Sequence, residues 1–326
     1  MVTDPWKMFR GADLGDNIEE VVETEECKVL RLNEPSGDGL MTIYRVFDGV
    51  YLMYNDFHLA HCYSRFTSCA NILCIDHCRE GRMEYAAAEN AVAYMSAGDM
   101  KLDRRLHHTG RFIFPTGHYH GLTVGLELTA ARKTLRTELK YFQIQPDQIF
   151  EKFELGEYPR VFHDAALVEH LFGEMYQVPQ AIRLPYLRTK ILELLLYLQG
   201  MEIPQETAER PYFYRTQVEK VRAIQRFLTE HLTQNISQEQ LSRQFDFPLT
   251  SMKKCFQSIT GSTIGAWVTT CRMNRAAEML RSDRGKSIAD VGCCVGYDSA
   301  SKFAAAFRKT MGMTPSEYRM ERGGKE

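Results

Sequence analysis

The sequence lacks the long apolar runs that a membrane-spanning helix requires. Its longest purely apolar stretches are about five residues, as at 194–198, whereas a helix needs ~20 to cross a bilayer. The first eleven residues include Asp4, Lys7 and Arg10 and no apolar segment, so they do not resemble a secretory signal. We therefore expect a cytoplasmic protein that makes no contact with a membrane.

Cysteine pairing signals and an excess of one charge are missing as well. The nine cysteines are an odd number and none forms a C-x-x-C pair, so reduced thiols are expected. The 326 residues include 40 Lys and Arg and 42 Asp and Glu, which gives a net charge of −2. This length predicts two domains, each large enough to bury its own core.

The low net charge is an average over two halves of opposite sign. Residues 212–326 contain 18 Lys and Arg and 11 Asp and Glu, a net charge of +7, whereas the first 211 residues contain 22 and 31, a net charge of −9. A basic module joined to an acidic one favours a polyanion-binding domain with a separate controlling domain. The alternative is a chance distribution of charge over a solvated surface.

A polar segment coincides with this change of charge. Residues 200–211 include two prolines and show no periodicity, which is typical of a linker. We therefore predict a first domain over residues 1–203, a linker over 204–214 and a second domain over 215–326.

The sequence of the first domain predicts strands followed by helices. Residues 41–59 and 71–94 are rich in Ile, Val, Tyr and Phe, with breaks such as Phe47-Asp48-Gly49. With 111–114 and 122–128 they predict a small barrel or sandwich of roughly eight strands. Helices are predicted over 164–177 and 184–199. The second has a stripe of Leu and Ile at i, i+3, i+4 spacing, which packs either on the sheet or on another subunit.

The second domain reads as almost wholly helical and contains a repeat. An offset of 51 residues superposes residues of like character, namely Met252 on Phe303, Phe256 on Phe307, Gly261 on Gly312, Thr263 on Thr314 and Trp267 on Tyr318. The aromatic members are expected in the core. Five matches at one offset indicate a duplicated unit.

Each copy has the pattern of a helix-turn-helix. Capping-box sequences at 237–240 and 287–290 each begin a short helix. Turns are predicted near 246–248 and 295–297, with second helices over about 250–259 and 299–310. One uninterrupted helix is predicted over 265–281, between the two copies.

About the last 110 residues, which include both copies, resemble the AraC family of bacterial transcription regulators. The matching positions are Gly296-Tyr297, Phe303, Phe307-Arg308-Lys309, Gly312-Met-Thr314-Pro315 and Tyr318-Arg319, and on the linking helix Arg272-Met273 and Ala276. The resemblance implies an α+β protein of two domains: a cupin-like β-barrel or sandwich with flanking helices, which binds an effector and dimerises, then an all-α domain with two helix-turn-helix units joined by a long helix.

By the same resemblance the protein binds promoter DNA as a homodimer, and RNA polymerase is a further candidate partner. The implied groove-facing residues are Thr250, Ser251, Lys253, Lys254 and Gln257 in the first unit and Ser299, Ala300, Ser301, Lys302, Ala304 and Ala305 in the second. The implied phosphate contacts are Arg243, Arg272, Arg308 and Lys309, with Arg275 favoured as a solvated side chain. Because alanines donate no hydrogen bond, we expect the first unit to carry more of the sequence discrimination.

No effector-specific motif stands out in the first domain. The expected lining residues of an effector site are Tyr44, His77, Arg79, His118 and His120. A carboxylate or phenolate effector would suit the arginines, and a sugar, a peptide and an iron chelate are the alternatives. The segment Arg79-Glu80-Gly81-Arg82 has an alternative interpretation as an exposed hairpin turn. Seven of the ten histidines lie between residues 58 and 120, but no complete ligand set is visible, and we expect no bound metal or cofactor.

Two other function classes compete with a ligand-responsive regulator. One is a cupin-type metal-dependent enzyme, or a metal or redox sensor, with a DNA-binding appendage; it would need a complete ligand triad. The other is a DNA-repair protein with a reactive exposed cysteine, for which Cys62 and Cys69 are candidates. The regulator, which is not an enzyme, is the preferred hypothesis.

Overall fold

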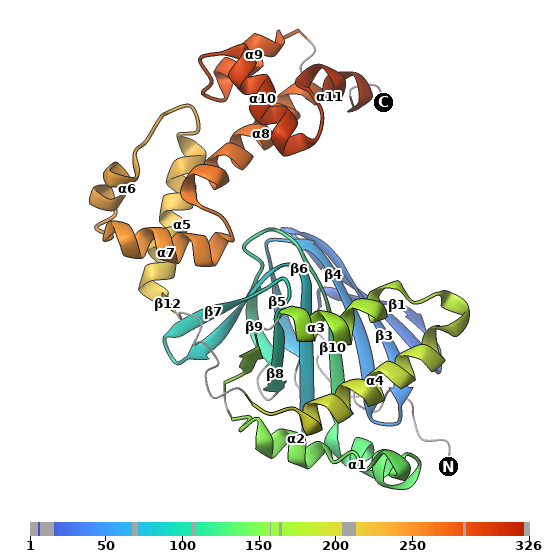
Figure 1. Ribbon diagram of the computed structural model, residues 1–326. Helices are drawn as coiled ribbons and strands as arrows, with labels where there is room; N and C mark the ends of the chain where they lie inside the picture. The colour runs from blue at the N-terminus through green and yellow to red at the C-terminus, as the bar shows by residue number, and fades with distance from the viewer. Residues whose placement is uncertain are drawn as a thin grey trace. The chain divides into compact units, whose positions relative to one another are not determined.

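The chain consists of two compact units, Met1–Tyr212 and Phe213–Glu326. The computed structural model describes residues 6, 16–66, 71–105, 108–156, 158–162, 165–203, 213–282 and 285–322 (Figure 1). Of the predicted linker over 204–214, only Phe213 and Tyr214 belong to the described residues, where they form the short strand β12 (Phe213–Tyr214).

The first unit is built on an antiparallel sheet. Its strands are β1 (Ile18–Glu23), β2 (Cys27–Glu34), β3 (Gly37–Phe47), β4 (Val50–Leu59), β6 (Ile72–Ala88), β7 (Ala91–Ser96), β8 (Met100–Arg104), β10 (Tyr119–Glu127) and β11 (Arg160–Phe162). The spatial order is β1-β2-β3-β4-β10-β6-β7, with β8 between β6 and β11. The remaining strands, β5 (His61–Phe66) and β9 (His108–Ile113), form a separate two-stranded sheet. The predicted antiparallel strands are confirmed, whereas the cupin-like topology stays a prediction.

Helices cover one face of the large sheet. They are α1 (Leu128–Thr137), α2 (Pro146–Lys152), α3 (Ala165–Phe172) and α4 (Arg183–Gly200), with the 3-10 turns η1 (Lys140–Phe142), η2 (Gly173–Gln177) and η3 (Gln180–Ile182) (Figure 1). The predicted helix over 164–177 therefore changes to 3-10 geometry at Gly173, and its first residue lies outside the described ones. On α4 the stripe that includes Leu187, Ile191 and Leu198 is buried in the core shared with the sheet. Packing on the sheet thus accounts for this stripe.

The face of the large sheet that the helices do not cover lies opposite the small sheet. Successive side chains of a strand point to opposite faces, so Ile75 and His77 of β6 lie on the helix-covered face while Cys74 and Asp76 lie on the other. Residues of β5 and β9, including Cys62 and Phe112, complete the enclosure of a cavity on that side.

The interpretation of Arg79-Glu80-Gly81-Arg82 as a hairpin turn is wrong. These residues lie within the long strand β6, where a bulge shifts the register against β10 and Gly81 takes a φ of +84°. A β-carbon at Gly81 would lie 2.2 Å from the carbonyl oxygen of His118, so glycine is needed for this close approach. Here a glycine between charged residues marks a bulge. The same pattern of residues is also typical of a hairpin turn.

The second unit is helical. Its helices are α5 (Arg215–Glu230), α6 (Gln238–Gln244), α7 (Leu249–Thr260), α8 (Ile264–Ser282), α9 (Ile288–Cys294), α10 (Ala300–Met311) and α11 (Pro315–Arg322). The predicted second helices of both units and the long connecting helix are confirmed, each to within a residue at either end. Both capping boxes are formed, by Ser237 with Gln240 and by Ser287 with Asp290.

The 51-residue repeat has a structural basis. Gly261 and Gly312 end α7 and α10 in the same left-handed conformation, with φ of 78° and 80°. Edge-to-face ring pairs follow at the same offset, Phe256 with Trp267 at 5.8 Å and Phe307 with Tyr318 at 5.4 Å. Phe256 and Phe307 are buried in the core, as the sequence predicts, and the half-buried Trp267 and Tyr318 pack against them.

Candidate nucleic-acid interface and ligand cavity

The helix α7 has one apolar and one polar face. Met252, Cys255, Phe256 and Ile259 are buried at helical spacing, and this fixes which side of α7 meets solvent. All the predicted groove-facing residues of the first unit are exposed: Thr250, Ser251, Lys253, Lys254 and Gln257. The helix contains no Asp or Glu, so its exposed face is cationic.

The helix α10 repeats this arrangement with a different outer surface. Phe303 and Phe307 are buried, and the exposed side combines alanines with cations. Of the predicted residues, Ala300, Ser301, Lys302, Ala305, Arg308 and Lys309 are exposed, whereas Ala304 and Ser299 are half-buried. The Ser299 hydroxyl caps α10 by accepting a bond from the Lys302 amide at 3.4 Å, so its main role in this structure is structural.

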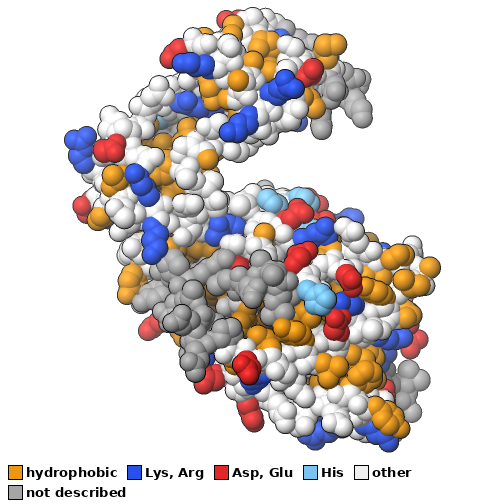
Figure 2. Space-filling view, in the orientation of Figure 1, with side chains coloured by type: hydrophobic (Ala, Val, Ile, Leu, Met, Phe, Trp, Pro, Cys, Tyr) orange, Lys and Arg blue, Asp and Glu red, His pale blue; other side chains and the backbone are white. Residues whose placement is uncertain are grey.

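The predicted phosphate contacts fall into two groups. Arg243, Arg308 and Lys309 are exposed, and Figure 2 shows Lys and Arg side chains at several places on the visible surface of the helical unit. Arg275 is also exposed and pairs with Glu278 at 3.1 Å, which suits a solvated helix face. Arg272 differs from all of these.

Arg272 is half-buried and bonds to carbonyl oxygens in two separate parts of the helical unit. Its Nε donates to the Leu232 carbonyl at 2.7 Å and its Nη2 to the Gln234 carbonyl at 3.0 Å, both in the segment before α6. Its Nη1 lies 3.5 Å from the carbonyl oxygen of Gly296, in the turn of the second unit, and its guanidinium packs on the Tyr297 ring. The guanidinium therefore connects the two helix-turn-helix units, and its contact with phosphate stays a prediction.

The cavity of the first unit lies between the large sheet and the β5–β9 sheet and has a volume of about 170 Å³. Its walls are mostly apolar. They include Leu30, Met41, Met53, Phe57 and Phe114.

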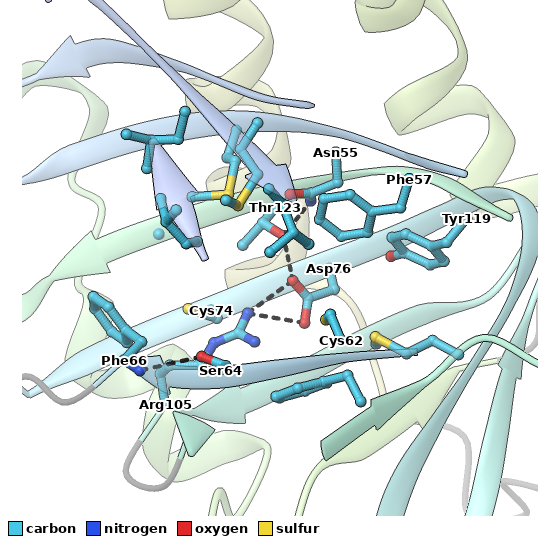
Figure 3. A pocket seen from close by; sticks show the side chains of 18 of the residues that line it. Asn55, Phe57, Cys62, Ser64, Phe66, Cys74, Asp76, Arg105, Tyr119 and Thr123 are labelled. Carbon is cyan, nitrogen blue, oxygen red and sulfur yellow. Dashed lines mark hydrogen bonds and ion pairs between the residues drawn. The ribbon is translucent and has the colours of Figure 1, made fainter. Parts of the chain in front are cut away.

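One wall of the cavity carries a buried polar network (Figure 3). Asp76 is 2% exposed, and its carboxylate accepts bonds from Arg105 at 2.9 and 3.1 Å and from the Thr123 hydroxyl at 2.6 Å. Lys101 pairs with the same carboxylate at 2.8 Å and with Asp103. The Asn55 amide donates to Thr123 at 3.1 Å. The Arg105 and Lys101 charges outweigh the effect of burial and hold the pKa of Asp76 well below its usual range.

None of the five predicted effector residues lines this cavity. Tyr44 accepts a bond from Arg183 at 2.9 Å, and His118 lies in the turn before β10 near the Thr116 carbonyl. The other three predicted residues, His77, Arg79 and His120, gather around Tyr176 of η2.

His77 is the most buried of them and is 1% exposed. Its Nδ1 lies 2.8 Å from the Tyr176 hydroxyl, and its ring stacks on Phe172 at 4.7 Å. Burial lowers the pKa of His77 from 6.5 to about 4, so the ring is neutral near pH 7. Asp76 and His77 point to opposite faces of β6, so His77 packs against Phe172 and Tyr176 and does not line this cavity. Its place in an effector site stays a prediction.

The described residues offer little to the competing function classes. No group of three or more His, Cys, Asp or Glu side chains that could hold a metal occurs among them. Cys62 is buried, and burial raises the pKa of its thiol to about 12, which makes it a poor nucleophile. Cys69 lies outside the described residues. None of the described helices is long and apolar enough to span a membrane.

Comparison with known proteins identifies the helical unit. Residues 235–321 match the family described as helix-turn-helix domain. The transcriptional activator RhaR of Mannheimia succiniciproducens is 26% identical over 124 residues, which are 38% of this chain and 45% of that protein. The transcriptional regulator ExsA of Pseudomonas aeruginosa is 31% identical over 99 residues, 30% of this chain and 35% of that protein.

Among solved structures, the C-terminal domain of AraT, a response regulator from Geobacillus stearothermophilus, is 28% identical. The match covers 33% of this chain and 88% of that chain, with a TM-score of 0.31. The aligned part of this chain spans less than half the length of the curated relatives named above. Residues 235–321 are an AraC-type helix-turn-helix domain, and the resemblance is confirmed for this part of the chain.

Proposed function

We propose that the protein is a sequence-specific DNA-binding transcription regulator that responds to a small-molecule effector. The observation that carries the proposal is the pair of outward-facing helices α7 and α10. Each is the second helix of a helix-turn-helix, and neither contains an acidic residue. Two such helices in one chain suit two successive major grooves on one face of B-DNA, which recur every ~34 Å.

The two helices have unequal capacity to read bases. The exposed face of α7 offers two lysines, a glutamine and two hydroxyls, which can hydrogen-bond guanine and adenine edges or phosphates. The face of α10 offers alanines beside Lys302, Arg308 and Lys309. Alanine contacts a thymine methyl group and donates nothing, so α7 is the main reader of sequence and α10 contributes mostly backbone affinity.

The sheet unit is the sensory part of this proposal. A preformed, mostly apolar cavity with a few converging polar groups is the usual form of a small-molecule site, and the cavity beside Asp76 has that form. A homodimer and a contact with RNA polymerase belong to the same proposal. Support for the dimer comes from exposed apolar side chains along α4, Leu196 and Tyr197, beside Phe142 of η1.

The test is a binding experiment with the full chain. A DNA ligand is selected from a random pool, and its affinity is measured by fluorescence anisotropy over a range of salt concentrations. Lys254→Ala is expected to weaken binding about ten-fold and relax selection at the positions it reads, because a good base contact contributes about 1–3 kcal/mol. Lys302→Ala is expected to lower the salt slope by about one phosphate equivalent.

The matched control is Arg226→Ala. Arg226 is exposed on α5, outside both helix-turn-helix units, so its loss removes the same charge from the same unit. If Lys254→Ala binds as tightly and as selectively as Arg226→Ala, α7 is not the reading helix. A full chain that selects no sequence from the pool would overturn the proposed function itself.

A further inference from the structure

We infer that the cavity beside Asp76 binds an electrically neutral, mostly apolar molecule about the size of one six-membered ring, which carries a single hydroxyl or carbonyl group. The inference rests on the proposed function, because it names the chemical class of the effector. It departs from the carboxylate or phenolate that the arginines of the sequence favour.

The size of the ligand follows from the volume of the cavity. An apolar cavity of about 150 Å³ in a protein core accommodates benzene, and this one measures about 170 Å³. A ring of six carbons with one short substituent therefore fits. The lining favours an apolar ring because side chains such as Leu30, Met53 and Phe114 form most of it.

The absence of charge on the ligand follows from the polar wall. The two carboxylates there, Asp76 and Asp103, are matched by the two cations Lys101 and Arg105, so the described network is balanced. A carboxylate ligand would lose its hydration without meeting an unpaired positive charge, which costs far more than the burial of a neutral group. A hydroxyl or carbonyl can enter such a site without disturbing the ion pairs.

A hydrogen-bonding partner for that group is present at the cavity wall. Tyr119 lines the cavity and is 3% exposed. Figure 3 shows this hydroxyl directed toward the side of Asp76. Burial raises the pKa of Tyr119 well above its ordinary value, so the hydroxyl is a neutral donor and acceptor.

Two glycines of β10 show where the cavity is open and where it is filled. A β-carbon at Gly121 would meet the His77 carbonyl oxygen at 2.4 Å and the Tyr119 hydroxyl at 2.7 Å. A β-carbon at Gly125, which also lines the cavity, would meet nothing within 4 Å. A larger side chain at Gly125 can therefore occupy the ligand's space without striking the backbone.

Three probes of nearly the same shape test the inference: benzyl alcohol, toluene and benzoate. Their binding to the full chain is measured by calorimetry and by the shift in melting temperature. Benzyl alcohol is expected to bind at least ten-fold more tightly than benzoate and several-fold more tightly than toluene. Benzoate that binds as tightly as benzyl alcohol overturns the neutral assignment, and toluene that does so overturns the polar contact. No binding of any probe overturns the site.

Cavity-filling variants locate the binding. Gly125→Leu is expected to reduce benzyl alcohol affinity at least ten-fold, and Gly125→Ala, which adds a single methyl group, to reduce it to an intermediate degree. Unchanged affinity in both variants places the probe elsewhere and overturns the inference. If Gly125→Leu fails to fold, the benzyl alcohol affinity of Gly125→Ala alone tests whether the probe binds in this cavity.

The same preparations are tested for DNA binding without a probe, which separates the two proposals. A chain that selects DNA but binds no probe loses only the ligand inference. A chain that binds benzyl alcohol in this cavity but selects no DNA loses only the proposed function.

Discussion

Arg272→Ala is the substitution that best tests how the two helix-turn-helix units are held together. The substitution removes two short hydrogen bonds, to the carbonyl oxygens of Leu232 at 2.7 Å and Gln234 at 3.0 Å. It also removes longer ones, to the Asn235 side chain at 3.4 Å and the Gly296 carbonyl oxygen at 3.5 Å. A bond from a charged donor contributes about 1.5–3 kcal/mol net. Because the guanidinium is half-buried and its bonds are not additive, we expect a loss of about 2–4 kcal/mol for the set.

The expected consequence is seen first in thermal unfolding. A domain of roughly this size loses about 4–8 °C in melting temperature per kcal/mol, so Arg272→Ala should lower the melting transition of the helical unit by about 10 °C or more. Binding to a selected operator should weaken, because α7 and α10 are no longer held at one separation. Binding to the same DNA with the second half-site scrambled should change much less.

Arg272→Lys discriminates this role from a phosphate contact. Lysine keeps the charge but cannot span four acceptors with its single ammonium group. If Arg272 connects the units, both variants lower the melting temperature and leave the salt slope of DNA binding unchanged. If it contacts phosphate, Arg272→Lys resembles the parent, and Arg272→Ala lowers the slope by about 0.9 with little change in melting. The second pattern would refute the connecting role.

Two further predictions concern the sheet unit. The pKa of His77 is about 4 in the folded chain, below its ordinary value of 6.5. As the pH falls, His77 therefore takes up a proton in the unfolded chain before it does so in the folded chain. The free energy of unfolding should drop by about 2–3 kcal/mol between pH 6.5 and 4. Denaturant titrations should show a flatter pH profile for His77→Gln than for the parent chain, and equal profiles for the two would contradict this assignment. Asp76→Asn should cost about 3–5 kcal/mol because it leaves two buried cations with one carboxylate. The control is Asp16→Asn at the exposed pair of Asp16 with Arg65, which should lower the free energy of unfolding by less than ~1 kcal/mol. An equally small decrease for Asp76→Asn would contradict the stabilising role of the buried network.

The helical unit was predictable from sequence because its signals are local. Capping boxes, glycine at helix ends and the spacing of apolar residues act within a few residues of each other. Gly261 and Gly312 end their helices as the repeat implies. Arg272 shows the limit of such signals, because its acceptors at residues 232–235 and 296 are far away along the chain.

The cavity was not predictable because its polar wall is assembled from distant strands. Asn55 comes from β4, Asp76 from β6 and Thr123 from β10, and they become neighbours only through the pairing of β10 with both β4 and β6. The prediction named His77, which lies in a histidine-rich stretch and is one residue from Asp76. In a strand, a difference of one residue selects the opposite face of the sheet.

The charge of a whole domain is also a poor guide to the charge of its ligand. The first 211 residues have a net charge of −9, whereas the arginines of this domain suggested an anionic effector. Solvent screens charges that are more than about 10 Å apart at the surface, whereas a buried network acts on its neighbours with little screening. A molecule in the cavity therefore meets Asp76 and Arg105, whose charges are balanced with those of Asp103 and Lys101 behind them. This local balance favours a neutral ligand whatever the net charge of the domain around it.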